Sequence, residues 1–359
     1  MKGRDKKRSS IISVSGNVIA IIQVVVLLFL CMSGYGYLIH PSACPWLVSL
    51  SLAFGGLLLI YVALALIMLV VYPSRGWKSL LGLIVCFGPI RTYFPVNPKF
   101  VDENDSVLKV MSYNVDNFSQ DDSHAHTTMM EYLKSCSADI LCMQESDYYE
   151  PSYLKDSVLS RWKYVDKTML HTNALVIGSH YPILDKCIVK GPDASHGAVI
   201  YRLLYGQETI SVVNCHFVSN TISGHDKLLF KRIIKSPKKN EVKQGMPYLA
   251  LKVDSAGVSR ARQVDQLMPV IKMLKGAIIL CGDLNDSPMS YVHGQLEKVL
   301  DDAYVGGGNG PGITYHEAGM YFRIDHIFCS KHWKVVKSYV DNDISSSDHY
   351  PMYTWLQKK

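Results

Sequence analysis

The sequence predicts an α/β protein in which two packed, mainly antiparallel sheets carry outer helices and follow N-terminal transmembrane helices. Three observations lead to this fold class. The composition changes near residue 100, from long uncharged apolar runs to a mixed sequence. Beyond that point many short apolar runs alternate with amphipathic or irregular stretches, as in packed sheets with few helices. Several of these runs end in acids, amides and histidines.

Two apolar runs near the N-terminus each exceed the roughly 20 residues that a spanning helix needs. They cover residues 11 to 39 and 46 to 72 and contain no charged residue. The second run begins with Trp46 and ends with Tyr72, and these residue types anchor helices at the membrane interface. We therefore expect two transmembrane helices.

Residues 79 to 90 form a third apolar segment, which is only about a dozen residues long before Arg91 and is therefore short for a span. It crosses the membrane if residues 92 to 96 lie in the interface. Otherwise it is a re-entrant or surface-lying segment. Both interpretations stay open at this point, and they place the rest of the chain on opposite sides of the membrane.

Lysines and arginines in short loops indicate the orientation. Five of the first ten residues are basic, residues 34 to 45 contain no Lys or Arg, and Arg75 and Lys78 follow the second apolar run. The tail and the second loop are thus expected to be cytoplasmic. We expect a multi-pass protein of the inner membrane. Its large domain is extracytoplasmic if the third segment spans, which we favour, and cytoplasmic if it does not. The predicted organisation is a basic tail at 1–10, a membrane region at 11–98 and the large domain at 99–359.

The net charge of +6 is concentrated in two places. One is the N-terminal tail, and the other is the stretch 226–252, which has eight basic and two acidic residues. The remainder is acidic, which argues against a domain coated in positive charge for binding duplex nucleic acid. We expect residues 226–252 to be a solvated, mobile insertion. Contact with anionic lipid or a phosphorylated substrate is the alternative.

The nine cysteines contain no CxxC pair and no Cys/His spacing typical of zinc sites. Four of them, Cys142, Cys215, Cys281 and Cys329, lie inside apolar strand-like runs. They are expected to be buried free thiols.

The large domain has a series of predicted strands and two predicted helices. The strands are expected at residues 108–113, 138–145, 174–179, 198–204, 209–217, 277–281, 323–330 and 352–356, and the helices at 126–135 and 259–275. No repeat period is visible.

Six strand ends carry groups suited to metal and phosphate chemistry. In chain order these are Asn114 with Asp116, Gln144 with Glu145, Asn214 with His216, Asp283 with Asn285, Asp325 with His326, and Asp348 with His349. Hard oxygen ligands are those that Mg²⁺ prefers, since it retains waters and also binds substrate phosphate. Hydrolysis of a phosphate ester needs a metal, a positioned water and groups that move protons. The six strand ends together therefore predict one such site.

These motifs resemble the endonuclease/exonuclease/phosphatase superfamily, which includes deoxyribonucleases, abasic-site endonucleases, neutral sphingomyelinases and inositol polyphosphate 5-phosphatases. The resemblance covers about residues 106 to 357, in order. It rests on SYNVDNF, LCMQE, NCHF, CGDLND, RIDHIF and SSDHYP. It implies a four-layer sandwich with the active site at one end of the two sheets. The chain looks most similar to the membrane-attached bacterial branch.

The resemblance also implies a metal site. Glu145 resembles the principal Mg²⁺ ligand, and Asn114 supports it. Asp348 resembles a further carboxylate of the metal site. Asp116 matches an acid that only some branches have. The implied cofactor is Mg²⁺, with Mn²⁺ as a substitute.

The implied catalytic residues come from four of the six strand ends. Asp283 and Asn285 resemble the pair that positions the attacking water and contacts the phosphate. His349, paired with Asp325, resembles the histidine that stabilises or protonates the phosphoryl group. His216 resembles the histidine of the deoxyribonuclease and sphingomyelinase branches.

Four other residues differ from the functional pattern or are expected to be structural. His180 replaces the basic residue that the family usually carries before an aromatic-Pro pair, so a phosphate contact there is not expected. Arg260 and Gln263 are expected to pack, and Asp286 is expected to stabilise the turn.

The sequence therefore predicts a membrane-anchored, Mg²⁺-dependent phosphoesterase that hydrolyses phosphodiester or phosphomonoester bonds. Its substrate class stays open among lipid headgroups, nucleic acid and inositol phosphates. A nuclease acting on DNA or RNA is one alternative. A non-catalytic membrane scaffold that retains the fold is an alternative of another class. No protein partner is predicted.

Overall fold

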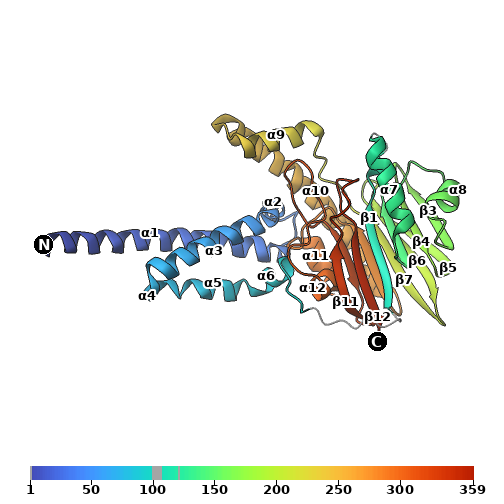
Figure 1. Ribbon diagram of the computed structural model, residues 1–359, viewed down its shortest axis with the longest axis horizontal. Helices are drawn as coiled ribbons and strands as arrows, with labels where there is room; N and C mark the ends of the chain where they lie inside the picture. The colour runs from blue at the N-terminus through green and yellow to red at the C-terminus, as the bar shows by residue number, and fades with distance from the viewer. Residues whose placement is uncertain (1, 99–106, 120–121) are drawn as a thin grey trace.

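The protein has two parts, a bundle of N-terminal helices and a β-sandwich (Figure 1). The computed structural model describes residues 2–98, 107–119 and 122–359. The predicted start of the large domain at residue 99 therefore lies outside the described residues, whereas its first strand does not.

Two six-stranded sheets form the sandwich. The first has the order β11-β12-β1-β2-β4-β3, with β11 (Trp333–Val340), β12 (Met352–Lys358), β1 (Val107–Asn114), β2 (Ile140–Gln144), β4 (Asn173–Ser179) and β3 (Tyr164–Leu170). The second has the order β5-β6-β7-β8-β10-β9, with β5 (Ile183–Lys190), β6 (Gly197–Tyr205), β7 (Glu208–His216), β8 (Ile278–Asp283), β10 (Asp325–Cys329) and β9 (Asp301–Asp302). All pairings are antiparallel except β1 with β2 and β7 with β8.

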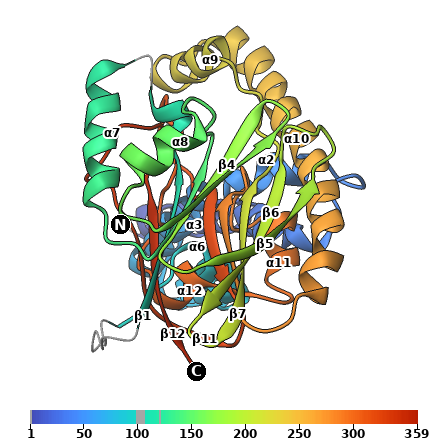
Figure 2. The ribbon, with the colours of Figure 1, turned by 90° about the vertical axis from the view of Figure 1, so that its right-hand side faces the viewer.

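Three apolar layers hold the sandwich together. Side chains such as Val110, Ile177 and Val212 fill the space between the sheets. Met129 and Leu133 of helix α7 (Ser123–Ser135) cover the outer face of the first sheet. Helices α10 (Lys239–Met273) and α11 (Tyr291–Leu296) cover the second. Figure 2 shows the two sheets between these helices. The predicted four-layer α/β sandwich is confirmed.

The strand register brings the ends of the central strands together. In the first sheet Asn114 lies opposite Gln144, the residue before Glu145. In the second, Asp283 lies between His216 of β7 and Asp325 of β10. Because β1 and β8 are the inner strands of facing sheets, these side chains meet at one end of the sandwich.

The helical bundle contains two helices long and apolar enough to cross a membrane. They cover Ser15–Leu38, which is mostly helix α1 (Lys2–Tyr35), and Phe54–Val71, which is helix α3. The second predicted span, 46–72, is wrong in its extent. Its first turns form a separate helix, α2 (Trp46–Leu52), which packs on the sandwich.

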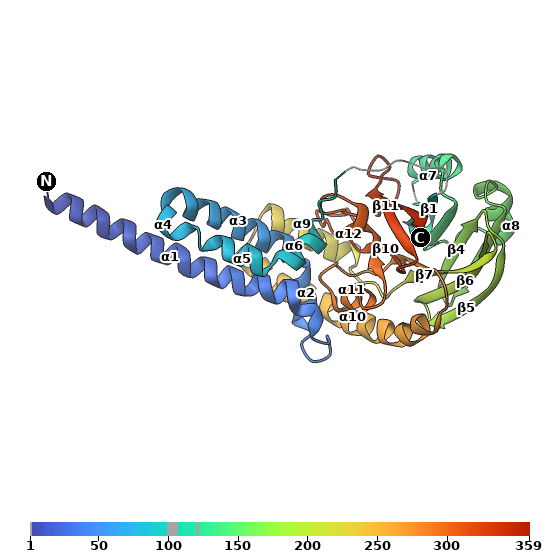
Figure 3. The ribbon, with the colours of Figure 1, turned by 90° about the horizontal axis from the view of Figure 1, so that it is seen from below.

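The third apolar segment packs lengthwise in the bundle. Helix α4 (Pro73–Gly76) turns the chain, and α5 (Ser79–Val85) and α6 (Phe87–Tyr93) run back along α1 and α3 toward the sandwich (Figures 1 and 3). Cys86 and Leu83 pack with Leu30 and Phe54. The N-terminus and α4 therefore lie at the end of the bundle that is remote from the sandwich.

A cysteine pair tests this packing. The Sγ atoms of Cys31 in α1 and Cys86 lie 3.7 Å apart. We expect mild oxidation of the full chain in detergent to join them, as detected by mass spectrometry of peptides. Gly55→Leu should reduce the cross-link, because a Cβ at Gly55 would lie 2.3 Å from the Tyr93 hydroxyl of α6. Gly56→Leu, at a glycine whose added Cβ meets nothing within 4 Å, should leave it intact. Equal cross-linking in both variants would contradict the packing.

Residues 226–252 are mostly helical rather than the loose insertion that the sequence predicts. They form helix α9 (Gly224–Lys235) and the first two fifths of α10, which begins 20 residues before the predicted helix 259–275 and ends two residues before that helix does. Ile233 and Leu229 of α9 pack against Gly245 of α10. The burial of these two apolar side chains stabilises the two helices, which the basic composition of the stretch did not predict.

The bundle joins the sandwich close to the end of β8. Met289 packs with Leu30 and Phe54 of the bundle. Ser51 of α2 lies 3.1 Å from Ser287, measured between hydroxyl oxygens. Val48 fills the space above Gly257 of α10. The turn that follows Asp283 therefore lies against the helices.

Candidate active site

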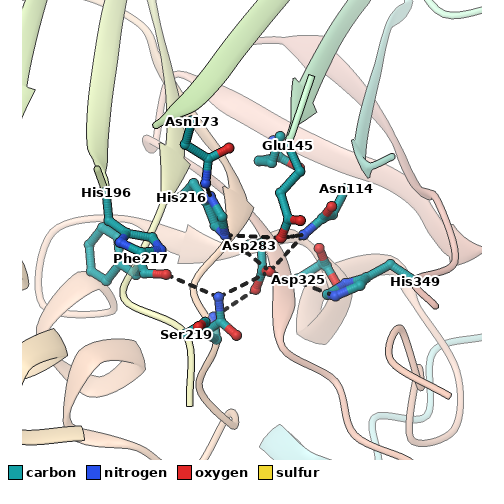
Figure 4. Close-up of polar contacts among 12 residues, drawn as sticks. Asn114, Glu145, Asn173, His196, His216, Phe217, Ser219, Asp283, Asp325 and His349 are labelled. Carbon is teal, nitrogen blue, oxygen red and sulfur yellow. Dashed lines mark hydrogen bonds and ion pairs between the residues drawn. The ribbon is translucent and has the colours of Figure 1, made fainter. Parts of the chain in front are cut away.

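Glu145 and Asp283 face each other across the two sheets, and Asn114 bridges them (Figure 4). The Asn114 amide donates to Glu145 Oε1 at 2.8 Å and to Asp283 Oδ2 at 3.1 Å. Asp283 is buried, whereas the Glu145 side chain is about one third exposed. Glu145 has a φ of 52°, a left-handed conformation that costs a non-glycine residue energy. This backbone turns its carboxylate toward the other sheet.

His216 completes one side of this group. Its Nε2 lies 3.5 Å from Glu145 Oε1 and 3.8 Å from Asp283 Oδ2. The Asn173 amide donates to Nδ1 at 2.8 Å, which leaves Nε2 to face the two carboxylates. That atom is buried and has no hydrogen-bond partner among the described residues.

His349 and Asp325 form a close pair on the opposite side. His349 Nδ1 lies 2.7 Å from Asp325 Oδ2 and its Nε2 lies 3.8 Å from Asp283 Oδ2. Asp325 Oδ1 is buried with no hydrogen-bond partner among the described residues. The pair fixes the imidazole with Nε2 directed at the centre of the site.

Asn285 holds the Asp283 carboxylate in place. Its backbone N–H donates to Asp283 Oδ1 at 2.7 Å, and its amide donates to Asp283 Oδ2 and to the carbonyl of Phe217. Asp286 turns away and accepts a hydrogen bond from Arg260 Nε at 3.2 Å. The turn role expected for Asp286 and the packing role expected for Arg260 both agree with this geometry.

Asp348 and Asp116 lie at the rim rather than with the central carboxylates. The closest cation to Asp348 is Lys227 Nζ of α9, at 3.7 Å from Oδ2. Asp116 is exposed, with a φ of 42°. Asp348 Oδ1 still lies within 3.9 Å of His349 Nε2. Seven of the nine predicted residues thus meet at one centre, and Asp348 and Asp116 lie at its rim.

Burial controls the charge of the central groups. Burial, together with the Asp325 carboxylate, raises the pKa of Asp283 to about 8. Burial also raises the pKa of Glu145, against the Asn114 hydrogen bond. Although burial opposes its charge, His349 has a pKa well above the usual value, because Asp325 and Asp283 lie beside it. Burial lowers the pKa of His216, which is therefore neutral.

The central residues fit a divalent cation. Glu145, His216 and Asp283 present ligand atoms within 4.8 Å of one another, and so do Asp283, Asp325 and His349. Carboxylates that resist ionisation when alone are stabilised by a nearby cation. Because His216 is neutral and its Nδ1 accepts from Asn173, the ring proton lies on the unpartnered Nε2, which can donate a hydrogen bond to a group bound at this centre. Mostly oxygen ligands suit Mg²⁺ or Mn²⁺ better than zinc.

Two residues of the site were not predicted individually from the sequence. Asn173 orients His216 but lies at the start of β4, far from any motif. Lys227 reaches Asp348 and Glu317 from the basic stretch. Asn173 and Lys227 reach the site through tertiary packing, which a local sequence pattern does not predict.

A second group of buried polar residues lies behind the site. His293 Nε2 is 2.8 Å from Asp302 Oδ2, and His326 Nε2 donates to the carbonyl of Asp286 at 3.0 Å. His326 thus supports the turn that carries Asn285 and is not directed at the central carboxylates. Burial, with His293 nearby, lowers the pKa of His326 to about 3.

This shift predicts acid sensitivity. Between about pH 6.5 and 3 the unfolded chain binds a proton at residue 326 that the folded chain does not, so stability falls as the pH falls through this range. His326→Gln, which keeps an N–H donor, should lose less unfolding temperature between pH 7 and 5 than the wild type. The exposed residue His124 gives the control, His124→Gln, which should behave as the wild type does. The measurement is thermal unfolding in detergent at each pH. If the unfolding temperature of His326→Gln fell with pH as steeply as that of the wild type, His326 would not be the cause of the acid sensitivity.

Comparison with known proteins finds a family match for each of the two parts of the chain. Residues 111–349 match the profile of the endonuclease/exonuclease/phosphatase family, and residues 16–93 match a domain of unknown function (DUF8431). No curated protein matches the sequence.

Solved structures share the fold at low identity. TDP2 from D. rerio complexed with single strand DNA product is 16% identical over 71% of this chain and 100% of that chain, with a TM-score of 0.51. A humanized D. rerio TDP2 with 14 mutations is 15% identical over 71% of this chain and 100% of its own, with a TM-score of 0.50. The 3′ phosphatase NExo from Neisseria, bound to product DNA hairpin, is 16% identical over 69% and 98%, with a TM-score of 0.49.

The family profile covers well over half of the chain and includes every strand end of the site. The sandwich and its order of motifs agree with that match. The chain therefore belongs to the endonuclease/exonuclease/phosphatase family.

Proposed function

We propose that this protein is a membrane-anchored, metal-dependent phosphoesterase that uses water to hydrolyse a phosphate ester. The convergence of Glu145, Asp283, Asp325 and His349 on one centre carries the proposal. A cluster of three carboxylates, of which Asp283 and Asp325 are buried, is costly for a structural role alone. It is explained if the cluster holds a cation.

The proposed roles follow from the geometry. Glu145, Asp283 and Asn114 would hold Mg²⁺, which polarises phosphoryl oxygens when bound. Asn285 would orient Asp283, whose carboxylate would accept the proton of the attacking water. His349, kept protonated by Asp325, would donate to a phosphoryl oxygen. His216 would donate a hydrogen bond from the other side.

The bundle supports membrane anchoring and a topology. With α1, α3 and the α5–α6 segment each crossing the membrane, the sandwich lies on the side opposite the basic tail. The tail, Arg75 and Lys78 would then be cytoplasmic and the active site extracytoplasmic. Since Met289 packs in the bundle and lies six residues after Asp283, the site would lie near the bilayer surface. This placement favours lipid headgroup phosphates as the substrate class.

A substrate panel tests this function. The full chain in nanodiscs should hydrolyse at least one of four classes, which are phospholipids, inositol phosphates, single-stranded DNA and RNA. Activity should need Mg²⁺ and disappear with EDTA. Preference for phospholipid would support the membrane placement, and hydrolysis of DNA or RNA alone would replace it with a nuclease. No Mg²⁺-dependent product from any class would favour the non-catalytic scaffold.

A further inference from the structure

The connection between α9 and α10 forms a basic tip at the end of a helical hairpin. Residues 231 to 240 contain five basic residues and no acid. They are Lys231, Arg232, Lys235, Lys238 and Lys239, which are all exposed. The neighbouring apolar residue, Ile234, is 62% exposed to solvent. We define these six residues as the hairpin tip.

The hairpin is held firmly at its base. Ser223 and Asp226 form a capping box at the start of α9, and Lys252 of α10 bonds Asp226 at 2.6 Å. Lys227 contacts Glu317 and lies 3.7 Å from Asp348 at the rim of the active site. Further along α10, Asp254 accepts a hydrogen bond from the backbone of α2 at 2.9 Å. The base thus joins both the active site and the bundle, and the tip projects from a fixed support.

The direction of the hairpin brings the tip to the side where the membrane would lie. Figure 1 shows α9 beside the bundle, with the α9–α10 connection extending farther toward the N-terminal end than the rest of the sandwich. In Figure 3 as well, α9 and the bundle cover a common stretch of the molecule's long axis. A bilayer that surrounds α1 and α3 would therefore approach the tip before any other part of the sandwich.

The stability of α9 and α10 does not explain why the hairpin tip is so basic. Arg232 and Lys235 lie in the last turn of α9, where cations are favourable. Lys238 and Lys239, however, lie at the N-terminus of α10, where cations are unfavourable and no side chain caps the helix. Basic residues placed against the helix dipole, next to an exposed isoleucine, suit an anionic partner with an apolar layer beneath it.

We propose that the hairpin tip binds the anionic headgroup layer of the bilayer in which the chain's own helices lie. Ile234 would enter the upper acyl region, and the lysines would contact lipid phosphates. Contact at the tip would fix the height of the active-site rim, through Lys227, above the headgroups. The proposal rests on the membrane anchoring proposed above, but not on hydrolysis.

Hydrogen exchange of the full chain in nanodiscs tests the proposal. Each basic residue near an anionic surface strengthens binding about fivefold, so peptides covering 228–245 should exchange at least about tenfold more slowly in discs with 30% phosphatidylglycerol than in phosphatidylcholine discs. Lys235→Glu/Lys238→Glu/Lys239→Glu should abolish the difference. Lys155→Glu/Lys163→Glu/Lys190→Glu changes three exposed lysines that lie away from the hairpin and should preserve it.

Two outcomes would overturn the proposal. One is equal exchange of the tip in both lipids, as expected for a solvated hairpin. The other is protection by a single-stranded oligonucleotide in neutral discs without protection by anionic lipid, which would indicate a nucleic-acid surface. The same measurement on Glu145→Ala separates the two claims. Protection there would support tip binding even if no substrate is hydrolysed, and failure of the chain to enter discs would refute the membrane anchor itself.

Discussion

Glu145→Ala is expected to reduce Mg²⁺-dependent hydrolysis at least about 10³-fold, which corresponds to about 4 kcal/mol of transition-state stabilisation. The carboxylate of Glu145 accepts from Asn114 and faces His216 and Asp283. Its removal leaves Asp283 as the single acid on that side of the centre. The measurement is the initial rate with the substrate that the panel identifies, at saturating Mg²⁺.

The control for this variant is Glu150→Ala. Glu150 is exposed and lies five residues after Glu145, so its removal should leave the rate within about twofold. Thermal unfolding should be similar for both variants, because Glu145 is partly exposed. Wild-type turnover in Glu145→Ala would remove Glu145 from the metal site and with it the proposed mechanism.

Gly282→Ala is expected to destabilise the sandwich by at least about 4 kcal/mol and to abolish activity. Gly282 has a φ of 146°, which side chains rarely adopt, and a Cβ there would lie 1.9 Å from the carbonyl oxygen of Cys215. Because Gly282 and Cys215 are paired between β8 and β7, relief of the clash must separate these strands. Asp283 and His216, the next residues on each strand, would move apart.

Gly206→Ala separates the backbone strain of a positive φ from the clash with the Cys215 carbonyl oxygen. Gly206 also has a positive φ, of 64°, but an added Cβ meets nothing within 4 Å. Its substitution should cost only about 1 to 2 kcal/mol of backbone strain. Denaturant unfolding of both variants gives the comparison. A similar loss in each would show that the close approach at Cys215 is not the reason for the glycine.

The sequence alone predicts the sandwich and most of the residues that lie together at its end, because these residues end strongly apolar strands. Asp283 follows a buried run, and so does His216, so their placement at a sheet end depends on local pattern only. The strands β3, β5, β9 and β11 were not predicted. Strand β5 is largely exposed and therefore lacks the apolar run on which the prediction depends.

Other features depend on contacts between distant segments. The break between α2 and α3 is marked by no charged residue and no proline, and it arises because α2 packs on α10. The basic stretch folds into helices because Ile233 and Leu229 are covered by α10. Asn173 and Lys227 reach the site only in the folded chain. A pattern of residue types contains no information on such pairings.

Direct metal binding tests the central claim most closely. Mn²⁺ added to the full chain in detergent can be followed by the loss of the free-ion signal in electron paramagnetic resonance. Wild-type protein and Glu150→Ala should bind Mn²⁺, and Mg²⁺ should compete for the same site. Glu145→Ala should bind at least about tenfold more weakly. Unchanged affinity in Glu145→Ala, or no binding by the wild type, would contradict a metal site formed by Glu145, Asp283 and their neighbours.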